Sequence, residues 1–281
     1  MIATTGTTTT GIARFSLTSA DPSRFARFYI GLLGFTPAIA YRVDASIYGA
    51  TGMATVQRLR LGAQEIELVG FDTPGAPYPP DSTSHDRWFQ HLALVTTDIA
   101  AAYARLTTTA DWDAITAGSR PVQLPQSSGG VTAFKFRDPE GHPLELLEFP
   151  AGGAPSHWAN SSAIGPCIGI DHSAIVVTDT DASIAFYEGF GLAVGNRSRN
   201  HGPEQQALDG VSDVAVDVTA LSHDGATPHL ELLAYATPAV RGGTSGPADI
   251  ACTRSVLTDA DAGQPARILI DPDGHRVILT G

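Results

Sequence analysis

The chain has few cysteines, no long apolar run and no signal-peptide pattern at its start. Each of these shortages argues against a class of protein. Its two cysteines, Cys167 and Cys252, have neither the spacing of a metal site nor the number needed for a disulfide framework. It contains no run of about 18 apolar residues, so no transmembrane helix is expected. The opening residues, MIATTGTTTTG, lack the basic start and apolar centre of a signal peptide. We therefore expect a cytoplasmic protein with a short disordered tail at 1–10.

Charge is also scarce and mostly of one sign. Charged residues make up 16% of the 281 residues, and the formal net charge is −12. Such a chain is poorly suited to bind nucleic acid or an anionic membrane surface. Hydrophobic residues reach 43%, enough for one large or two ordinary packed domains. We expect the partner to be a small-molecule substrate, and the protein to be a monomer or a homodimer.

The sequence contains a spaced repeat. Four segments each begin with an apolar strand that leads to an aspartate suited to cap a helix. A helix usually follows, and then two or three strands. The fourth copy is too short to contain a full helix. The anchoring aspartates of units one to four are Asp21, Asp98, Asp179 and Asp259.

Proline- and glycine-rich joins separate the units. The join PAGGAPSHWANSS has the composition most typical of a domain boundary. It predicts a first domain at 11–150, containing units one and two, and a linker at 151–167. The second domain is then 168–281, containing unit three and the truncated unit four.

Polar residues interrupt the expected strands at matching places. His91 and His172 each lie seven residues before their anchoring aspartate, and Glu145 and Glu231 lie in the last strand of the same units. In each strand the His or Glu is on the opposite face from an aliphatic set. A buried carboxylate is costly unless it is paired or binds a metal. Two imidazoles and two carboxylates would neutralise one divalent cation, so these four residues are the predicted metal ligands.

Units one and four lack this pair. By the same count, unit one has Arg14 and Glu67, and unit four has Cys252 and Ile278. Arginine would put a fixed positive charge at a ligand position. We expect Glu67, beside Glu65, to be solvated or salt-bridged.

The segments RFYIGLLGF, AFYEGFGL, FRDPEGHPLELLEF and IDPDGH resemble the vicinal oxygen chelate superfamily, also called the glyoxalase/bleomycin-resistance/dioxygenase group. The resemblance covers nearly the whole chain. It implies an α+β fold of βαβββ units, in which two units form an open, curved mixed sheet around a cleft with helices outside. Metal ligands then come from the first and last strands of each unit. Four units imply two sheets and two clefts.

The arrangement of the candidate site depends on which units share a sheet. If neighbours pair, unit two lies with unit one, and the two His–Glu pairs are in different clefts. If the pairing is crossed, units two and three share a sheet, and one cleft holds both pairs. This is the ligand set of glyoxalase I-like members. We favour crossed pairing because it gathers both intact pairs.

The resemblance implies three functions, which remain open at this point. The first is a metal-dependent isomerase, epimerase or lyase using Ni²⁺, Co²⁺, Zn²⁺ or Mn²⁺, with Glu145 or Glu231 as the general base for an enediolate. The second is an Fe(II)-dependent ring-cleaving dioxygenase. The third is a drug-binding resistance protein that uses no metal. We favour the first.

Several other residues are candidates for lesser roles. Arg87, His201 and Glu204 are candidate substrate contacts, the last two in the polar segment NHGPEQQALDG, which is expected to be a loop. His142 and His275 follow the glycines of two Asp-Pro-x-Gly turns and are expected to be exposed.

Overall fold

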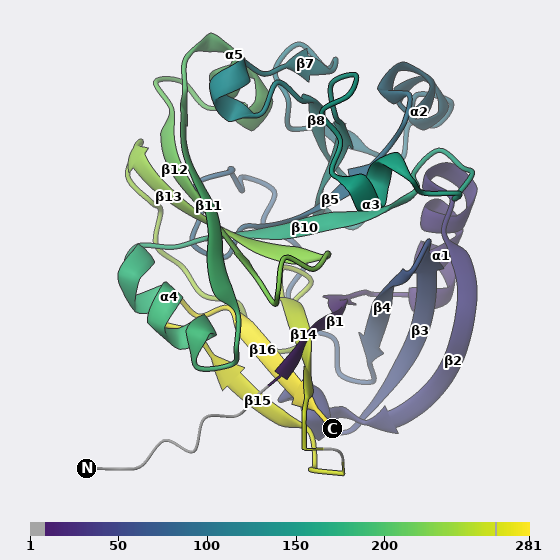
Figure 1. The fold of residues 1–281 in the computed structure, drawn as a ribbon. Helices are drawn as coiled ribbons and strands as arrows, with labels where there is room; N and C mark the ends of the chain where they lie inside the picture. Colours follow the sequence, from purple (N-terminus) through teal and green to yellow (C-terminus); the bar gives the residue numbers. More distant parts are fainter. Residues whose placement is uncertain (1–8, 262) are drawn as a thin grey trace.

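The computed structural model describes residues 9–261 and 263–281. Within these residues it has two open mixed β-sheets and five short α-helices, as expected for an α+β fold (Figure 1). Residues 1–8 of the expected tail lie outside the described residues, and residues 9 and 10 begin the first strand.

The first sheet is formed by units one and four, and we call it the 1–4 sheet. Its strands are β1 (Thr9–Thr18), β2 (Thr36–Asp44), β3 (Met53–Leu61), β4 (Gln64–Phe71), β14 (Thr253–Asp259), β15 (Arg267–Ile270) and β16 (Arg276–Thr280). They lie in the order β15-β16-β14-β1-β4-β3-β2. The two units meet where β1 pairs antiparallel with β14.

The second sheet is formed by units two and three, and we call it the 2–3 sheet. Its strands are β5 (Gln90–Val95), β6 (Asp113–Ala114), β7 (Val122–Gln123), β8 (Thr132–Arg137), β9 (Pro143–Glu148), β10 (Gly169–Val176), β11 (Ala193–His201), β12 (Ala215–Ser222) and β13 (His229–Thr237). They lie in the order β11-β12-β13-β10-β5-β9-β8-β6, with β7 beside β8. The two units meet where β10 pairs antiparallel with β5.

The crossed pairing of units is therefore confirmed, and pairing of neighbours within a sheet is wrong. Neighbouring units instead pack through their helical sides. One apolar core joins the aliphatic faces of units one and two, and a second core joins those of units three and four. Each half of the chain thus contributes to both sheets. The domain boundaries at 150 and 168 stay a prediction.

Helices follow three of the four anchoring aspartates, as predicted. The helices are α1 (Pro22–Phe28, continued by a π turn at Tyr29–Leu33), α2 (Ile99–Leu106), α3 (Ser156–Ala159), α4 (Thr180–Glu188) and α5 (Pro203–Asp209), with 3₁₀ turns at Ala45–Tyr48 and Gln126–Ser128. The carboxylates of Asp21, Asp98 and Asp179 each accept a backbone N–H of the first turn at 2.9–3.0 Å. The described residues between β14 and β15 form no helix, so the fourth unit is truncated as expected.

The segment expected to be a loop at NHGPEQQALDG is different. It completes β11 and then forms α5, which lies over the 2–3 sheet in Figure 1. Contacts with the first half of the chain stabilise this short helix: the N–H of Ala117 donates to the carbonyl of Ala207, and the hydroxyl of Ser84 donates to the carbonyl of Asp209. These contacts are non-local, so a local polar pattern does not predict them.

Candidate metal centre

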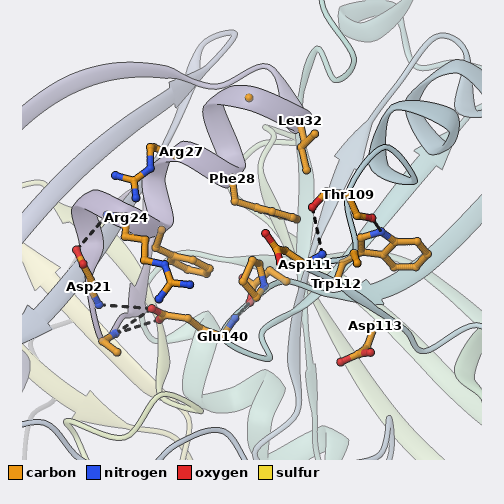
Figure 2. Close-up of a pocket in the computed structure, with 16 residues that line it drawn as sticks. Asp21, Arg24, Arg27, Phe28, Leu32, Thr109, Asp111, Trp112, Asp113 and Glu140 are labelled. Carbon is orange, nitrogen blue, oxygen red and sulfur yellow. Dashed lines mark hydrogen bonds between the residues drawn. The ribbon is translucent and has the colours of Figure 1, made fainter.

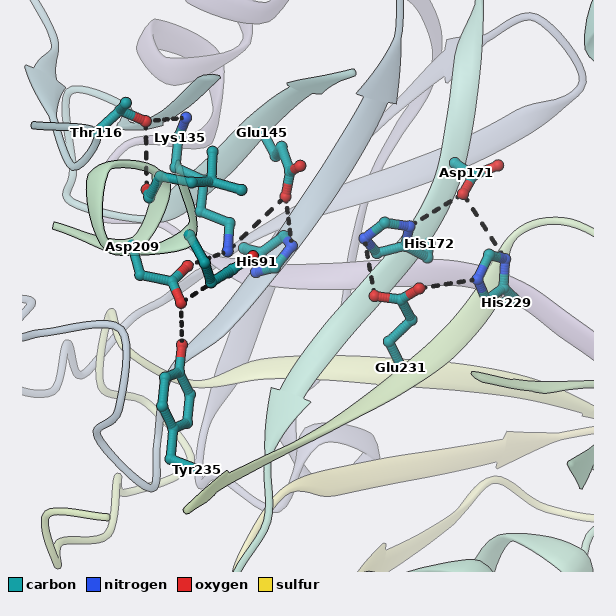
Figure 3. Close-up of polar contacts among 12 residues, drawn as sticks. His91, Thr116, Lys135, Glu145, Asp171, His172, Asp209, His229, Glu231 and Tyr235 are labelled. Atoms are coloured by element: carbon teal, nitrogen blue, oxygen red, sulfur yellow. Dashed lines mark hydrogen bonds and ion pairs between the residues drawn. The ribbon is translucent and has the colours of Figure 1, made fainter. Parts of the chain in front are cut away.

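The four predicted ligands lie on four adjacent strands of the 2–3 sheet. Glu145 is on β9, His91 on β5, His172 on β10 and Glu231 on β13 (Figure 3). All four line one cavity of about 260 Å³. The structure thus brings the four together.

Strand register explains this convergence. Across the antiparallel junction, His91 is opposite Ala174 and His172 is opposite Ala93. The parallel neighbours of these two alanines are Glu231 and Glu145, respectively. The two His–Glu pairs are therefore related by an approximate twofold arrangement, on the face that is opposite the aliphatic residues.

Donor atoms of three of the four residues are close enough to hold one ion. His91 Nε2 lies 2.9 Å from Glu145 Oε2, and the rings of His91 and His172 have centroids 5.6 Å apart. One donor atom from each of His91, Glu145 and His172 lies within 4.8 Å of the other two. Glu231 joins them from the other side, with Oε2 3.5 Å from His172 Nε2.

His91 is a buried imidazole without a conventional partner. Neither of its ring nitrogens makes an aligned hydrogen bond to any described residue, although Nε2 is in close contact with Glu145. Burial, together with the positive charge of Lys135, lowers the pKa of His91 below its ordinary value. The ring is therefore neutral at pH 7, the form that binds metals.

His172 is held by a carboxylate on its outer side. Its Nδ1 lies 3.0 Å from Asp171 Oδ2, which leaves Nε2 to face the cavity and Glu231. Such a carboxylate partner orients a metal-ligating histidine. Burial alone would lower the pKa of His172, but the charges of Glu231 and Asp171 raise it to about 9. Burial opposes the ionisation of Glu231, yet His172 and His229 lower its pKa to about 2.

The sequence reasoning missed a second polar cluster at the other end of the cavity. Lys135 on β8 is only 4% exposed, and its Nζ lies 2.7 Å from Asp209 Oδ1 and 4.0 Å from Glu145 Oε2. The other oxygen of Asp209 accepts from Gln205 Nε2 at 2.9 Å and Tyr235 Oη at 3.0 Å. Burial opposes the charge of Lys135, but Asp209 and Glu145 raise its pKa, so it remains a cation.

A signal in the sequence could have found this lysine. Lysine and arginine together number 17, and Lys135 is the only lysine of the chain. The chain otherwise uses arginine for its side-chain cations. The single lysine among arginines is therefore a signal that the sequence itself contains.

Three predicted substrate contacts are not brought to the cavity. Arg87 lies near Asp273, with Nε 3.7 Å from Oδ1. His201 ends β11, and Glu204 lies in the first turn of α5. None of the three is among the described residues that line the cavity. Their roles stay predictions.

The corresponding face of the 1–4 sheet carries buried, mutually packed side chains. Glu67 is fully buried and pairs with Arg14 at 2.7 Å and Arg58 at 3.5 Å, so it is salt-bridged but not solvated. An apolar cluster that includes Tyr48 and Phe71 packs in this sheet.

The position assigned to Cys252 must be corrected. Where β1 pairs with β14, Ser16 lies opposite Arg254. At the matching place in the 2–3 sheet, where β5 pairs with β10, Ala93 lies opposite His172. Arg254 therefore has the register position of a ligand histidine in unit four. It is buried, and its guanidinium stacks on the rings of Tyr48 and Phe71 at 5.5 and 5.7 Å.

The two turn histidines are buried, which corrects the expectation that they are exposed. The ring of His142 lies 3.1 Å from Asp138, which also accepts a hydrogen bond from the hydroxyl of Tyr29 at 2.8 Å. In the second half, His275 Nε2 lies 2.8 Å from the carbonyl of Val176. The helices of neighbouring units cover these turns, which is why the histidines are not solvated.

A larger hollow lies outside the sheets. It has a volume of about 640 Å³ and lies between α1 and residues 109–113 (Figure 2). Asp21 caps α1, and Glu140 accepts the backbone N–H of Ala20 at 3.0 Å. No histidine or cysteine is among the described residues that line it, so it offers a poorer ligand set than the cavity of the 2–3 sheet.

Known proteins resemble this chain in family and in fold. The profile of the Glyoxalase/Bleomycin resistance protein/Dioxygenase superfamily matches residues 11–146. This part of the chain belongs to that superfamily. The superfamily segment contains His91 and Glu145, whereas His172 and Glu231 lie beyond the matched residues. The internal repeat, rather than the profile, relates the second pair to the first.

Solved structures share the fold over nearly the whole chain. Glyoxalase I from Zea mays is 15% identical, with a TM-score of 0.58 over 95% of this chain and 91% of its own. A Bacillus subtilis protein proposed to be a dioxygenase is 14% identical, with a TM-score of 0.54 over 97% of this chain and 85% of its own. Comparison with curated proteins gives no match. At these identities the likeness shows the fold alone.

One further feature concerns membranes. Within the described residues, no helix is long and apolar enough to span a bilayer.

Proposed function

We propose that this protein is a metal-dependent enzyme of the vicinal oxygen chelate type. His91, Glu145, His172 and Glu231 would hold one divalent cation, and a small substrate would bind through two neighbouring oxygens. The reaction class is isomerase, epimerase or lyase chemistry through an enediolate. The observation that carries the proposal is the convergence of donor atoms from His91, Glu145 and His172 within 4.8 Å of one another.

The residues fit a divalent cation in charge and in hydrogen bonding. Two carboxylates balance two positive charges, and imidazole with carboxylate suits Ni²⁺, Co²⁺, Zn²⁺ or Mn²⁺. The lack of an aligned hydrogen bond at His91 Nε2 is explained if this nitrogen is a ligand. The proton on His172 now balances Glu231, and a cation at Nε2 would replace that proton as the positive partner.

The protein groups have distinct tasks in this chemistry. When bound, the cation supplies a Lewis acid that acidifies a C–H bond beside the chelating oxygens. A carboxylate oxygen of Glu145 or Glu231 takes up that proton and returns it to the product. Asp171 keeps His172 in the tautomer that presents Nε2. The buried strand faces exclude water from the reacting carbon.

A second candidate is an Fe(II)-dependent dioxygenase. His91, His172 and Glu145 alone form a set of two histidines and one carboxylate, the ligand type of non-haem Fe(II) oxygenases. Glu231 would then be free of the ion. The structural likeness to the Bacillus subtilis protein is compatible with this alternative.

Proton exchange distinguishes the two candidates. Protein loaded with Ni²⁺, Co²⁺, Zn²⁺ or Mn²⁺ is incubated in D₂O with small α-hydroxy ketones and acids, and loss of the α-proton signal is followed by NMR. We expect exchange with wild type and at least about a hundredfold slower exchange with Glu145→Gln or Glu231→Gln. Glu148→Gln is the matched control, since Glu148 is on the same strand and its carboxylate binds the N–H of Ile99.

Oxygen uptake is the opposing measurement. Protein loaded anaerobically with Fe(II) and then supplied with catechols and O₂ would consume oxygen if the second candidate is right. Oxygen uptake without α-proton exchange would contradict the enediolate proposal. Failure to take up any of these metals would contradict both and leave the metal-free binding protein.

A further inference from the structure

We propose that Lys135 makes the cavity selective for small carboxylic acids that carry an oxygen on the adjacent carbon, that is, 2-hydroxy and 2-oxo acids. The inference rests on the proposed function, because it places the carboxylate beside the ion held by the four ligands. It names a specificity-determining residue and a substrate class.

The ammonium group lies where a chelated substrate would meet it. Lys135 and Glu145 are directly paired residues on β8 and β9, so their side chains share one face of the sheet. Nζ lies 4.0 Å from Glu145 Oε2, which in turn lies 2.9 Å from His91 Nε2. The side chain lines the same cavity as the ligands. A ligand oxygen bound to the cation beside Glu145 would therefore lie next to Nζ.

The ammonium group of Lys135 has more N–H donors than hydrogen-bond partners among the described residues. An ammonium group has three N–H donors, and the only hydrogen bond of Nζ among the described residues is the one to Asp209. Two donors remain for a group in the cavity. A 95%-buried ammonium with unused donors is costly unless a ligand or water completes its shell.

Asp209 holds the ammonium group of Lys135 in place but accepts only one hydrogen bond from it. One of its oxygens meets Lys135, whereas the other accepts from Gln205 and Tyr235. The negative charge is therefore shared among three donors. The same bonds restrict Nζ to one place, so a ligand does not have to order a long flexible side chain.

Composition sets this position apart from the other basic residues of the chain. Every other basic side chain besides histidine in the chain is arginine. A guanidinium is a planar fork, whereas an ammonium is a compact point charge that can meet two acceptors from different directions. Between Asp209 and the Glu145 side of the cavity, the compact cation is the one that fits.

Cavity size limits the ligand. A volume of about 260 Å³ is at or below the lower end of the range for ligand pockets. A molecule of a few carbon atoms fits, but a peptide conjugate would have to extend out of it. Among small molecules with two neighbouring oxygens, the carboxylate is the group that benefits from a second cation.

The test compares two probes that differ in one charge. Binding of lactate and of lactamide to Ni²⁺-loaded protein is measured by calorimetry for wild type, Lys135→Met and Lys135→Arg. Lys135→Met should raise the Kd of lactate by at least about tenfold, the range for a hydrogen bond to a charged group, and leave that of lactamide unchanged. Arginine should not restore lactate binding. Arg199→Met removes an exposed cation of β11 and should change neither Kd.

Two further measurements keep the outcomes distinct. Lys135→Met/Asp209→Asn removes both charges, so that no unpaired carboxylate destabilises the fold, and it should lose lactate selectivity in the same way. Equal Kd changes for both probes, or no change, would overturn the inference. If wild type binds no metal, the proposed function fails, and the comparison is repeated on metal-free protein by NMR. Absence of a Lys135-dependent preference for lactate there would also refute the inference.

Discussion

At the residue scale, four equivalent positions distinguish the two clefts. In the 2–3 sheet they hold two histidines and two glutamates, and in the 1–4 sheet they hold two arginines, one glutamate and one isoleucine. The residues are His91, His172, Glu145 and Glu231 in the first case, and Arg14, Arg254, Glu67 and Ile278 in the second. Arginine cannot lose its proton to bind a cation, and its charge repels one. The same backbone thus supports a candidate site in one sheet and a packed interior in the other.

The pH dependence of stability can be predicted for His142. Burial alone would lower its pKa, but Asp138 raises it above the ordinary value. Because the pKa of His142 is higher in the folded protein than in the unfolded chain, where it is about 6.5, protonation of His142 stabilises the folded state. This contribution is complete below about pH 6.5 and disappears as the pH rises through the folded-state pKa. His142→Gln should therefore reduce the free energy of unfolding more at about pH 5.5 than at about pH 9.

Urea unfolding at the two pH values measures this difference. His157→Gln, at an exposed position, is the control and should show no such dependence. A loss in His142→Gln that is equal at both pH values would show that the Asp138 pairing does not couple to protonation.

The site residues that sequence could predict are those set by local alternation. His91 and Glu145 are polar residues in apolar strands, so their shared face is readable without a structure. Lys135 was missed because its partner Asp209 lies 74 residues away. Arg254 was missed because Asp259 ends a strand and caps no helix, which shifts the count by two residues.

At the element scale, α5 contributes Gln205, Leu208 and Asp209 to the wall of the cavity. It ends at Gly210, whose φ is +63°, and a Cβ there would lie 2.4 Å from the carbonyl oxygen of Ile115. Gly210→Ala should lower the free energy of unfolding by about 1–3 kcal/mol beyond the cost of placing alanine in the left-handed conformation. The extra loss is expected because the backbone of unit two cannot move away easily.

Gly118→Ala is the matched control. Its φ is +76°, but a Cβ there would meet nothing within 4 Å among the described residues. It should cost only the left-handed conformation, about 1–2 kcal/mol. Equal destabilisation of the two variants, measured by urea unfolding, would mean that α5 adapts freely to the added methyl group.

Elements with strong local signals were predicted well. The aspartate caps of α1 and α4 and the strands after the Asp-Pro-x-Gly turns are where the sequence indicated. α5 was not predicted, since Gly202 precedes it without a side-chain cap and its stability comes from contacts with the first half of the chain.

At the scale of the whole molecule, the candidate site requires both halves of the chain. The antiparallel junction of β5 and β10 brings His91 from the first half beside His172 from the second. Linker length and composition did not settle which units share a sheet. The number of intact His–Glu pairs favoured the crossed arrangement, which the topology confirms.

Cutting the chain in the linker tests this dependence. Fragments 1–150 and 151–281, expressed together with a tag on one of them, should purify as a complex that binds one metal ion. Each fragment alone has one His–Glu pair and unpaired sheet edges, so it should bind metal at least about a hundredfold more weakly and tend to aggregate. Metal affinity of the first fragment equal to that of the complex would show that its own pair suffices.

The central claim is that both histidines serve one ion. The most direct measurement is the metal content of wild type, His91→Ala and His172→Ala by mass spectrometry after equilibration with Ni²⁺, with His223→Ala as a control outside the cavity. The account predicts about one ion per chain in wild type and control, and almost none in either ligand variant. Retention of a full ion by either His91→Ala or His172→Ala would contradict it.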